Sequence, residues 1–201
     1  MCRWIVCLGI VVMMTFATAV GVAGDNQGQP AMSPEQQAMV EAWQQAMTPG
    51  PQHAALAKME GSYSMTVKMW MAPGAEPEVS TATSERRMIM GGRYLEETVH
   101  GTAMGEPFEG RGLTGYDNLR GEYWGVWIDN MSTGVSTSSG SWDDTTGVGT
   151  FTGSYVDPVS RQTVATRMTL ERHPDRSETM TTYEATPDGE VRTMEIVYQP
   201  R

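Results

Sequence analysis

The sequence predicts an all-β protein, an antiparallel up-and-down β-barrel of about ten strands preceded by a short N-terminal helix. Three observations predict it. From Gly61 onward, apolar residues such as Tyr63, Met65 and Val67 alternate with polar ones, which is the pattern of a half-buried strand. Turn-forming residues interrupt this alternation at short intervals. No apolar period of helical length intervenes, so the long crossovers that parallel strands require are absent.

Nine groups of turn residues separate ten candidate strands. They are Pro73-Gly74, Gly91-Gly92, Met104-Gly105, Asp117-Asn118, Asp129 to Gly134, Asp143 to Gly147, Asp157-Pro158, His173-Pro174-Asp175 and Pro187-Asp188-Gly189. An open sheet of this size would expose two edges and a large apolar face, whereas closure into a barrel removes both. A two-sheet sandwich is the alternative arrangement for the same strand spacing.

Residues 1–23 have the features of a secretory signal peptide. One basic residue, Arg3, precedes the apolar run Trp4 to Met14, and small residues follow. The run is shorter than the about 20 residues that a membrane-spanning helix needs, although a retained anchor is the alternative. Both cysteines lie in this segment, so the mature chain would contain no disulfide. We therefore expect a secreted or periplasmic protein.

After a polar linker (residues 24–32), we expect a helical segment over residues 33–59 and the barrel over residues 60–201. Ser33 and Gln36 form a capping-box pattern around Pro34. Met39, Trp43 and Met47 then recur at helical spacing until Pro49 and Gly50 end the helix. The apolar face of this helix is expected to pack across one end or side of the barrel.

The charge of the chain excludes one class of partner. The full sequence carries a net charge of -10, and removing residues 1–23 deletes one base and no acid, which gives -11. Such a surface repels phosphate backbones and anionic lipid heads, so we expect no nucleic-acid partner. No segment after the signal peptide is apolar enough to span a membrane, and the sequence indicates no oligomeric state.

No motif identifies a catalytic residue, a metal site or a cofactor. His53, His100 and His173 do not share the spacing of metal ligands, and His100 is either a surface residue or one that faces the interior. Glu96 and Glu97 are neighbours on a strand, so they point to opposite faces and cannot share a proton. The Gly-x-Ser-x-Gly pattern of a nucleophile is absent. Whether the protein is an enzyme is left open.

Six residues are candidates for binding a small ligand. Tyr123 and Trp127 share one face of a strand, where they are either ordinary core or walls of a cavity. Basic residues in or beside strands are either paired with neighbouring glutamates or able to recognise an anionic head group at the barrel mouth. These are Arg87, Arg93 and Arg111. Tyr116 completes the set.

Several short motifs, in this order, resemble the bacterial domain-of-unknown-function family 1579 over roughly residues 33–201. They are Gly61-Ser62-Tyr63, Met90-Gly91-Gly92-Arg93-Tyr94-Leu95, Phe108-Glu109-Gly110, Gly115-Tyr116-Asp117-Asn118 and Trp127 to Gly134, after His53-Ala54-Ala55-Leu56. The resemblance implies a calycin-like barrel, related in shape to lipocalins and fatty-acid-binding proteins, and no established activity. Tyr63 stands where calycins have a tryptophan. The histidine ligand of haem-binding relatives has no counterpart here.

These observations leave three hypotheses. The first is an exported barrel that binds a small amphipathic or hydrophobic molecule. The second is a structural or envelope-associated barrel with a filled interior. The third is an enzyme in which Arg93, Tyr116 and Asp117 converge inside the barrel. The strand count, the mixed polarity of the alternating faces and the family resemblance favour the first. The fourteen methionines that follow residue 23 are either adaptable packing or walls that suit variable apolar ligands.

Overall fold

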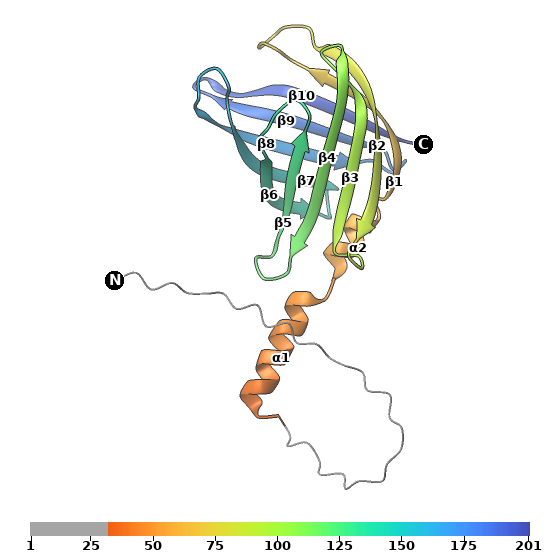
Figure 1. The fold of residues 1–201 in the computed structure, drawn as a ribbon, viewed down its shortest axis with the longest axis vertical. Helices are drawn as coiled ribbons and strands as arrows, with labels where there is room; N and C mark the ends of the chain where they lie inside the picture. The colour runs from red at the N-terminus through yellow and green to blue at the C-terminus, as the bar shows by residue number, and fades with distance from the viewer. Residues whose placement is uncertain (1–31) are drawn as a thin grey trace, which may run out of the picture.

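A computed structural model describes residues 32–201 and shows ten strands preceded by two helices (Figure 1). The predicted signal peptide and all but the last residue of the predicted linker lie outside these residues. The strands are β1 (Gly61–Met69), β2 (Glu78–Ile89), β3 (Tyr94–Ala103), β4 (Glu106–Asp117), β5 (Glu122–Asp129), β6 (Ser136–Asp143), β7 (Val148–Val156), β8 (Thr163–Arg172), β9 (Glu178–Thr186) and β10 (Gly189–Pro200).

The strands form a closed barrel in which each strand pairs with its neighbours in the chain and β1 pairs with β10. Every pairing is antiparallel. The predicted fold class is therefore confirmed, and the sandwich alternative is excluded. Each of the nine predicted turns falls between two successive strands. Closure leaves no sheet edge among the described strands, so every strand backbone finds partners on both sides.

The helical segment divides into α1 (Pro34–Met47) and α2 (Pro51–Ala57). The predicted capping box is present. The Ser33 hydroxyl accepts a hydrogen bond from the Gln36 backbone N–H at 3.3 Å, and Gln36 Oε1 accepts one from the Ser33 N–H at 2.8 Å. Helix α1 ends before Gly50, and α2 closes one end of the barrel, where its Leu56 is buried together with Met59, which follows the helix. We call this the lower end and the opposite one the upper end, as drawn in Figure 1.

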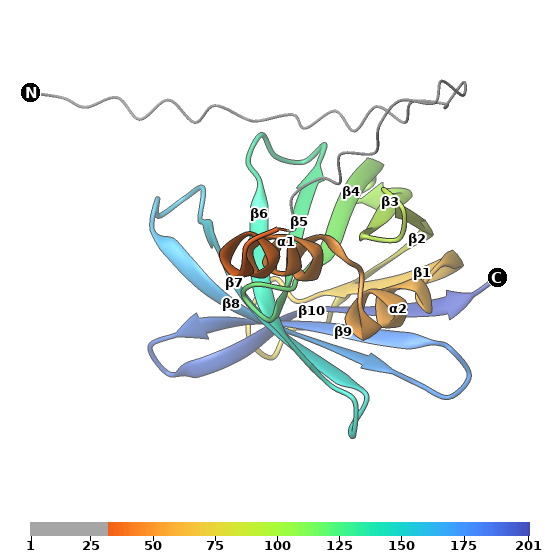
Figure 2. The same ribbon diagram turned by 90° about the horizontal axis from the view of Figure 1, so that it is seen from below.

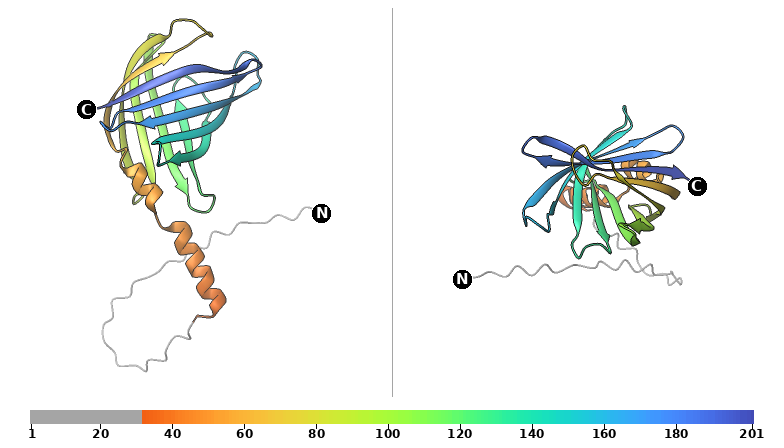
Figure 3. Two further views of the ribbon diagram at one scale, coloured as in Figure 1. Left: turned by 180° about the vertical axis from the view of Figure 1, so that it is seen from behind. Right: turned by 90° about the horizontal axis from the view of Figure 1, so that it is seen from above.

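The prediction that the apolar face of α1 packs on the barrel is wrong. No residue of α1 is buried, and Trp43 is 63% exposed. The reason is that the barrel forms hydrogen bonds with the C-terminal end of this helix and not with its apolar face. The Asn118 side chain donates hydrogen bonds to the carbonyls of Gln45 and Thr48 at 2.9 and 2.8 Å, and Arg93 donates one to that of Met47 at 2.8 Å. The helix therefore extends away from the strands, as the view from behind shows (Figure 3), and Figure 2 shows this end of the barrel from below.

The alternation along each strand decides which side chains face the lumen, the space that the ten strands enclose. Tyr63, Met65 and Val67 on β1 face inward, and the register carries this face around the barrel to Tyr198 and Ile196 on β10. The inward side chains form two apolar clusters. One packs against α2 at the lower end, and the other lines β1, β3 and β10. None of the helices in residues 32–201 has the length and apolar character of a membrane span.

Candidate binding site in the barrel lumen

Part of the inner wall keeps some exposure to solvent. Inward-facing side chains in a closed barrel can meet solvent only through its two ends. Several inward-facing residues on β6 to β9 are nevertheless only half-buried, well inside their strands. They include Ser138, Gly153, Thr166, Met168, Met180 and Thr182. The backbone of α2 lies closest to β2, β3 and β4, while its apolar cluster reaches Trp142, Phe151 and Met168 on β6 to β8 near the lower end.

Small residues widen this part of the lumen. Gly125, Ser138 and Gly153 are register partners on β5, β6 and β7, so three adjacent strands present almost no side chain at one level. A Cβ added at Gly125 would lie 2.9 Å from the Ser138 hydroxyl. Gly125 and Gly153 therefore let neighbouring strands approach closely, and this part of the wall carries little side-chain volume.

An aromatic wall faces this space. The rings of Phe108 and Trp127 are stacked, with centroids 6.4 Å apart and planes 16° apart. The Trp127 indole lies flat over β4, because a Cβ at Gly110 would come within 2.3 Å of its Cζ2. Its Nε1 donates a hydrogen bond to Asp129 Oδ2 at 2.8 Å. The indole is thus fixed, with its polar edge satisfied and one apolar face turned to the interior.

A buried cluster of charges lies near the lower end. Arg86 Nη1 donates to Glu178 Oε2 at 2.5 Å and Nε donates to Glu97 Oε1 at 3.0 Å. Ser84 donates to the same Glu97 oxygen at 2.6 Å. Burial by itself lowers the pKa of Arg86, but Glu97, Tyr198 and Glu178 outweigh it and raise the pKa. The guanidinium is therefore charged and paired with two carboxylates. This pairing indicates a structural role for Arg86 and not the binding of a ligand.

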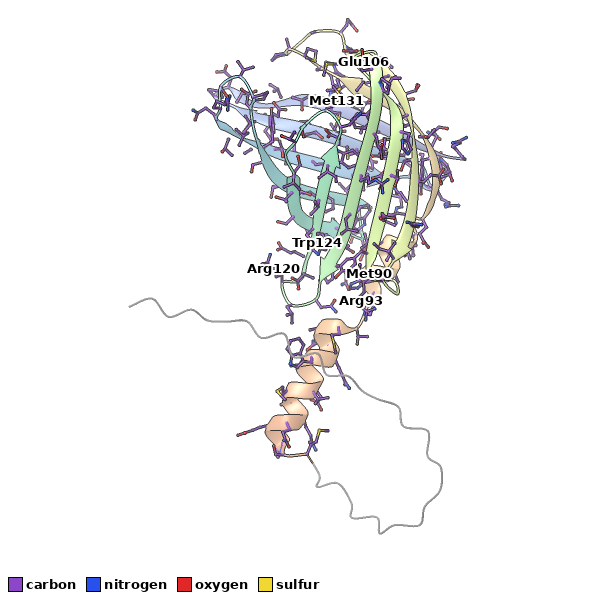
Figure 4. All side chains as sticks on the ribbon, in the orientation of Figure 1. Met90, Arg93, Glu106, Arg120, Trp124 and Met131 are labelled. Atoms are coloured by element: carbon purple, nitrogen blue, oxygen red, sulfur yellow. The ribbon has the colours of Figure 1, made fainter. Side chains whose placement is uncertain are left out.

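Acidic residues surround the upper end of the lumen. Glu78, Glu106, Asp129 and Glu184 occupy inward-facing register positions on four strands near this rim. Glu106 is visible at the upper end in Figure 4. Burial and the nearby Glu184 raise the pKa of Tyr155 at the same rim. An anionic group entering from this end would therefore meet a negative potential.

The structure separates the six predicted ligand-binding residues. Tyr123 and Trp127 face the lumen, as predicted for one strand face, and Tyr116 packs edge-on against Tyr123 at 4.9 Å between centroids. Arg87 and Arg111 point outward. Arg87 is 73% exposed and pairs with Glu96 at 2.7 Å, while Arg111 pairs with Glu109 at 3.4 Å. Of the two predicted roles, Arg87 and Arg111 thus have the first, which is pairing with a neighbouring glutamate.

Arg93 lies at the lower end, beside α1 (Figure 4). It lines a pocket of about 240 Å³ together with His53, Tyr94, Tyr116, Asn118 and the last residues of α1. The polar groups of this pocket are occupied. Arg93 and Asn118 hold the carbonyls of α1, and His53 Nδ1 accepts from the Gly50 N–H at 3.0 Å. Burial lowers the pKa of His53, which disfavours protonation of the ring. The pocket therefore lies where α1 meets the barrel, and its polar groups connect the two.

A second pocket, of about 260 Å³, lies at the upper ends of β4 and β5. It is lined by Glu109, Arg111, Ile128, Asp129 and Asn130. The side chain of Asn130 has a structural role, because it accepts a hydrogen bond from the Glu109 N–H at 3.0 Å and donates one to the Pro107 carbonyl at 2.9 Å.

Within residues 32–201, no three His, Cys, Asp or Glu side chains gather as a metal site.

Sequence reasoning missed the buried charges. Arg86 faces the lumen whereas its neighbour Arg87 does not, and Glu178 is only 1% exposed. The available signal was the strand period, since Arg86 shares a face with Ser84 and Met88. The burial of His53 was missed for another reason. The sequence of α2 does not show that this short helix packs against the barrel.

Comparison with known proteins agrees with this fold. A family model described as protein of unknown function (DUF1579) matches residues 48–200. Comparison with curated proteins gives no significant match. The crystal structure of Rv2717c from M. tuberculosis is similar with a TM-score of 0.57, at 16% sequence identity, over 77% of this chain and 99% of that chain. At this identity, the likeness concerns the fold alone.

Proposed function

This chain belongs to the DUF1579 family, whose function is unknown, and we propose that its barrel binds a small, largely apolar molecule in the lumen. One observation carries the proposal: inward-facing residues such as Ser138 and Met180 are half-buried inside a closed barrel. An interior that side chains do not fill, with apolar walls and few polar groups, is the usual form of a small-molecule site.

The walls suggest the chemistry of the guest. Trp127 and Phe108 offer a flat apolar surface, and the methionines of β8 to β10 adapt to different shapes. Tyr123 belongs to the lower floor of the same space. The acidic rim favours a guest whose polar end is neutral or positive, because Glu106 and Glu184 would repel an anionic head group. The guest is thus an amphipathic or hydrophobic molecule without a negative charge.

A fluorescent apolar probe tests the proposal. Ser138→Phe fills the space between Gly125 and Gly153, whereas Thr137→Phe places the same ring on the outer face of the same strand. With the neutral probe N-phenyl-1-naphthylamine, we expect the wild type and Thr137→Phe to bind alike and Ser138→Phe to bind at least about ten-fold more weakly. Native mass spectrometry of protein purified from its host would then identify the natural guest.

Two results would overturn the proposal. One is a wild-type protein that does not bind the probe, and the other is a Ser138→Phe variant that binds it unchanged. Either result would favour the alternative of a structural barrel without a ligand. Circular dichroism of both variants distinguishes a filled lumen from a protein that has failed to fold.

We also propose that the protein works outside the cytoplasm, after residues 1–23 are removed. The support is the order of a basic end, an apolar run and small residues in this segment. Expression of the whole chain in a bacterium, followed by cell fractionation and mass determination, tests it. The expected product is an exported chain that begins near residue 24. A full-length product retained in the cytoplasm would contradict it.

A further inference from the structure

Four methionines lie next to one another on the inner wall formed by β8, β9, β10 and β1. Met69 and Met194 are direct register partners. Thr182 is the partner of Met168 on one side and of Met194 on the other. Met180 precedes Thr182 by two residues and therefore faces the same way. We refer to Met69, Met168, Met180 and Met194 as the methionine patch.

The spacing lets these side chains converge. Directly opposed residues on antiparallel strands have Cβ atoms about 5 Å apart, and diagonal neighbours lie about 7–8 Å apart. Met180 is the diagonal neighbour of both Met168 and Met194. An unbranched methionine side chain with three rotatable bonds can span half of such a distance. Met180 and Met194 pack against the same apolar cluster and Met69 is the register partner of Met194, so these three thioether sulfurs can approach one point, while Met168 packs against the lower cluster.

Strand alternation sets the patch on the inner wall. Met194 follows the inward side chains of Tyr198 and Ile196 at steps of two residues and lies opposite Met69. The register between β9 and β10 shifts by one residue between Arg192 and Met194, and this bulge places Arg192 on the outer face. All four patch residues are half-buried.

Carboxylates flank the patch. Glu78 is the register partner of Met69, and Glu184 follows Thr182 by two residues on the inner face of β9. The basic residues near this part of the wall point elsewhere: Arg167 binds Glu190, and Arg192 lies 3.9 Å from the Trp70 ring. The described surroundings of the patch therefore favour a cation over a neutral or negative guest.

We propose that the methionine patch binds a soft monovalent cation of the Cu(I) type. Thioether sulfur is a soft ligand that selects Cu(I) over the hard cations preferred by carboxylates. The neighbouring carboxylates contribute long-range attraction. This inference goes beyond the binding of an apolar guest. The two proposals share the methionines of β8 to β10 but need different properties of them, since a guest requires apolar volume, which leucine also supplies, and a soft cation requires sulfur.

Titration with Ag(I), a redox-inert soft cation, tests the site. The experiment uses the whole chain in a Cys2→Ser/Cys7→Ser background, so that thioethers are the only sulfur ligands. We expect one equivalent to bind, and Cu(I) kept reduced to compete with a colorimetric chelator. Met180→Leu/Met194→Leu conserves volume and should weaken binding at least about ten-fold. Met88→Leu, an inward methionine of the lower end, should bind as the background does.

The outcomes separate the two proposals. Absence of Ag(I) binding in the background chain, or unchanged binding in Met180→Leu/Met194→Leu, would overturn the cation site. Equal losses in the double variant and in Met88→Leu would overturn it too, because the effect would then not belong to the patch. Ser138→Phe should keep its affinity for Ag(I). The double variant should still bind the naphthylamine probe, because leucine conserves the apolar volume of the wall and removes only the sulfur, so either proposal can fail alone.

Discussion

Arg86 and Glu178 meet inside the barrel although 92 residues separate them in the chain, with Nη1 2.5 Å from Oε2. They belong to β2 and β9, and the strands between them are β1 and β10. The guanidinium lies over the ring of Tyr63 at 4.8 Å and over that of Tyr198 at 4.3 Å. This ion pair therefore crosses the seam where the first and last strands close the barrel, and it joins the two ends of the fold.

Removing Arg86 should open this seam. In Arg86→Met, Glu178 keeps its charge in a buried place with only the longer contact to Arg172, at 3.4 Å. Leaving a buried charge without its main partner costs about 3–5 kcal/mol, which should appear in urea unfolding. Arg87→Met removes an exposed pair on the next residue and should change the free energy of unfolding little. Equal losses in the two variants would contradict the role given to the buried pair.

Stability should fall in alkaline solution because of Tyr198. Burial raises the pKa of Tyr198, and Glu97 acts in the same direction. The unfolded tyrosine ionises near pH 10, whereas the folded one resists ionisation. The unfolded state then holds fewer protons, so the stabilisation is complete below about pH 10 and declines by about 1.4 kcal/mol per pH unit above it.

Tyr198→Phe isolates this contribution. Its free energy of unfolding should fall less steeply than that of the wild type between pH 9 and pH 11, so that the difference between the two proteins shrinks as the pH rises. Denaturant unfolding at several pH values measures both slopes. Parallel curves would show that Tyr198 ionises alike in the folded and unfolded states.

The position of Trp127 depends on the glycine beneath it. Gly110→Ala would place a Cβ 2.3 Å from Trp127 Cζ2 and 3.2 Å from Phe108, so the stacked pair must shift. Overpacking of this kind costs about 1–3 kcal/mol, and the tryptophan fluorescence should change as well. Gly134→Ala is the control, because nothing lies within 4 Å of its added Cβ. Unaltered fluorescence and stability in Gly110→Ala would mean that the indole is not fixed.

The orientation of α1 should depend on Asn118. In Asn118→Ala the carbonyls of Gln45 and Thr48 lose their partner, so we expect the helix to sample a wider range of directions. Spin labels at Gln37 and on the outer face of β6 would report a broader distance distribution. Arg120→Ala removes a neighbouring exposed side chain of the same turn and should leave the distribution narrow. A narrow distribution in both variants would assign the restraint to Arg93 alone.

The fold could be predicted because its signals are local. A period of two, nine turn groups and the absence of helical crossovers need only neighbouring residues, and together they leave few topologies. The capping box at Ser33 and the end of α1 before Gly50 were readable for the same reason. The packing of α1 could not be predicted from the sequence. An apolar helix face indicates that burial would be favourable, but it does not show which part of the protein lies close enough to cover it.

The site was predictable in part. Tyr123 and Trp127 share a strand face in any register, and the lumen receives that face. The arginines depend on register instead. Arg86 and Arg87 are consecutive, both strand faces carry polar residues, and a shift by one residue exchanges inside for outside. The sequence favoured Arg87 as a candidate, and the barrel turned Arg86 inward.

What the sequence by itself determined is the set of strands, their antiparallel order and the residues that can share a face, because these follow from covalent geometry and turn chemistry. The tertiary structure decided which face is inner, where the lumen stays open and which charges meet. Those outcomes depend on closure between β1 and β10, which fixes the register of all ten strands together. A seam between the two ends of a chain brings residues into contact that no local pattern relates.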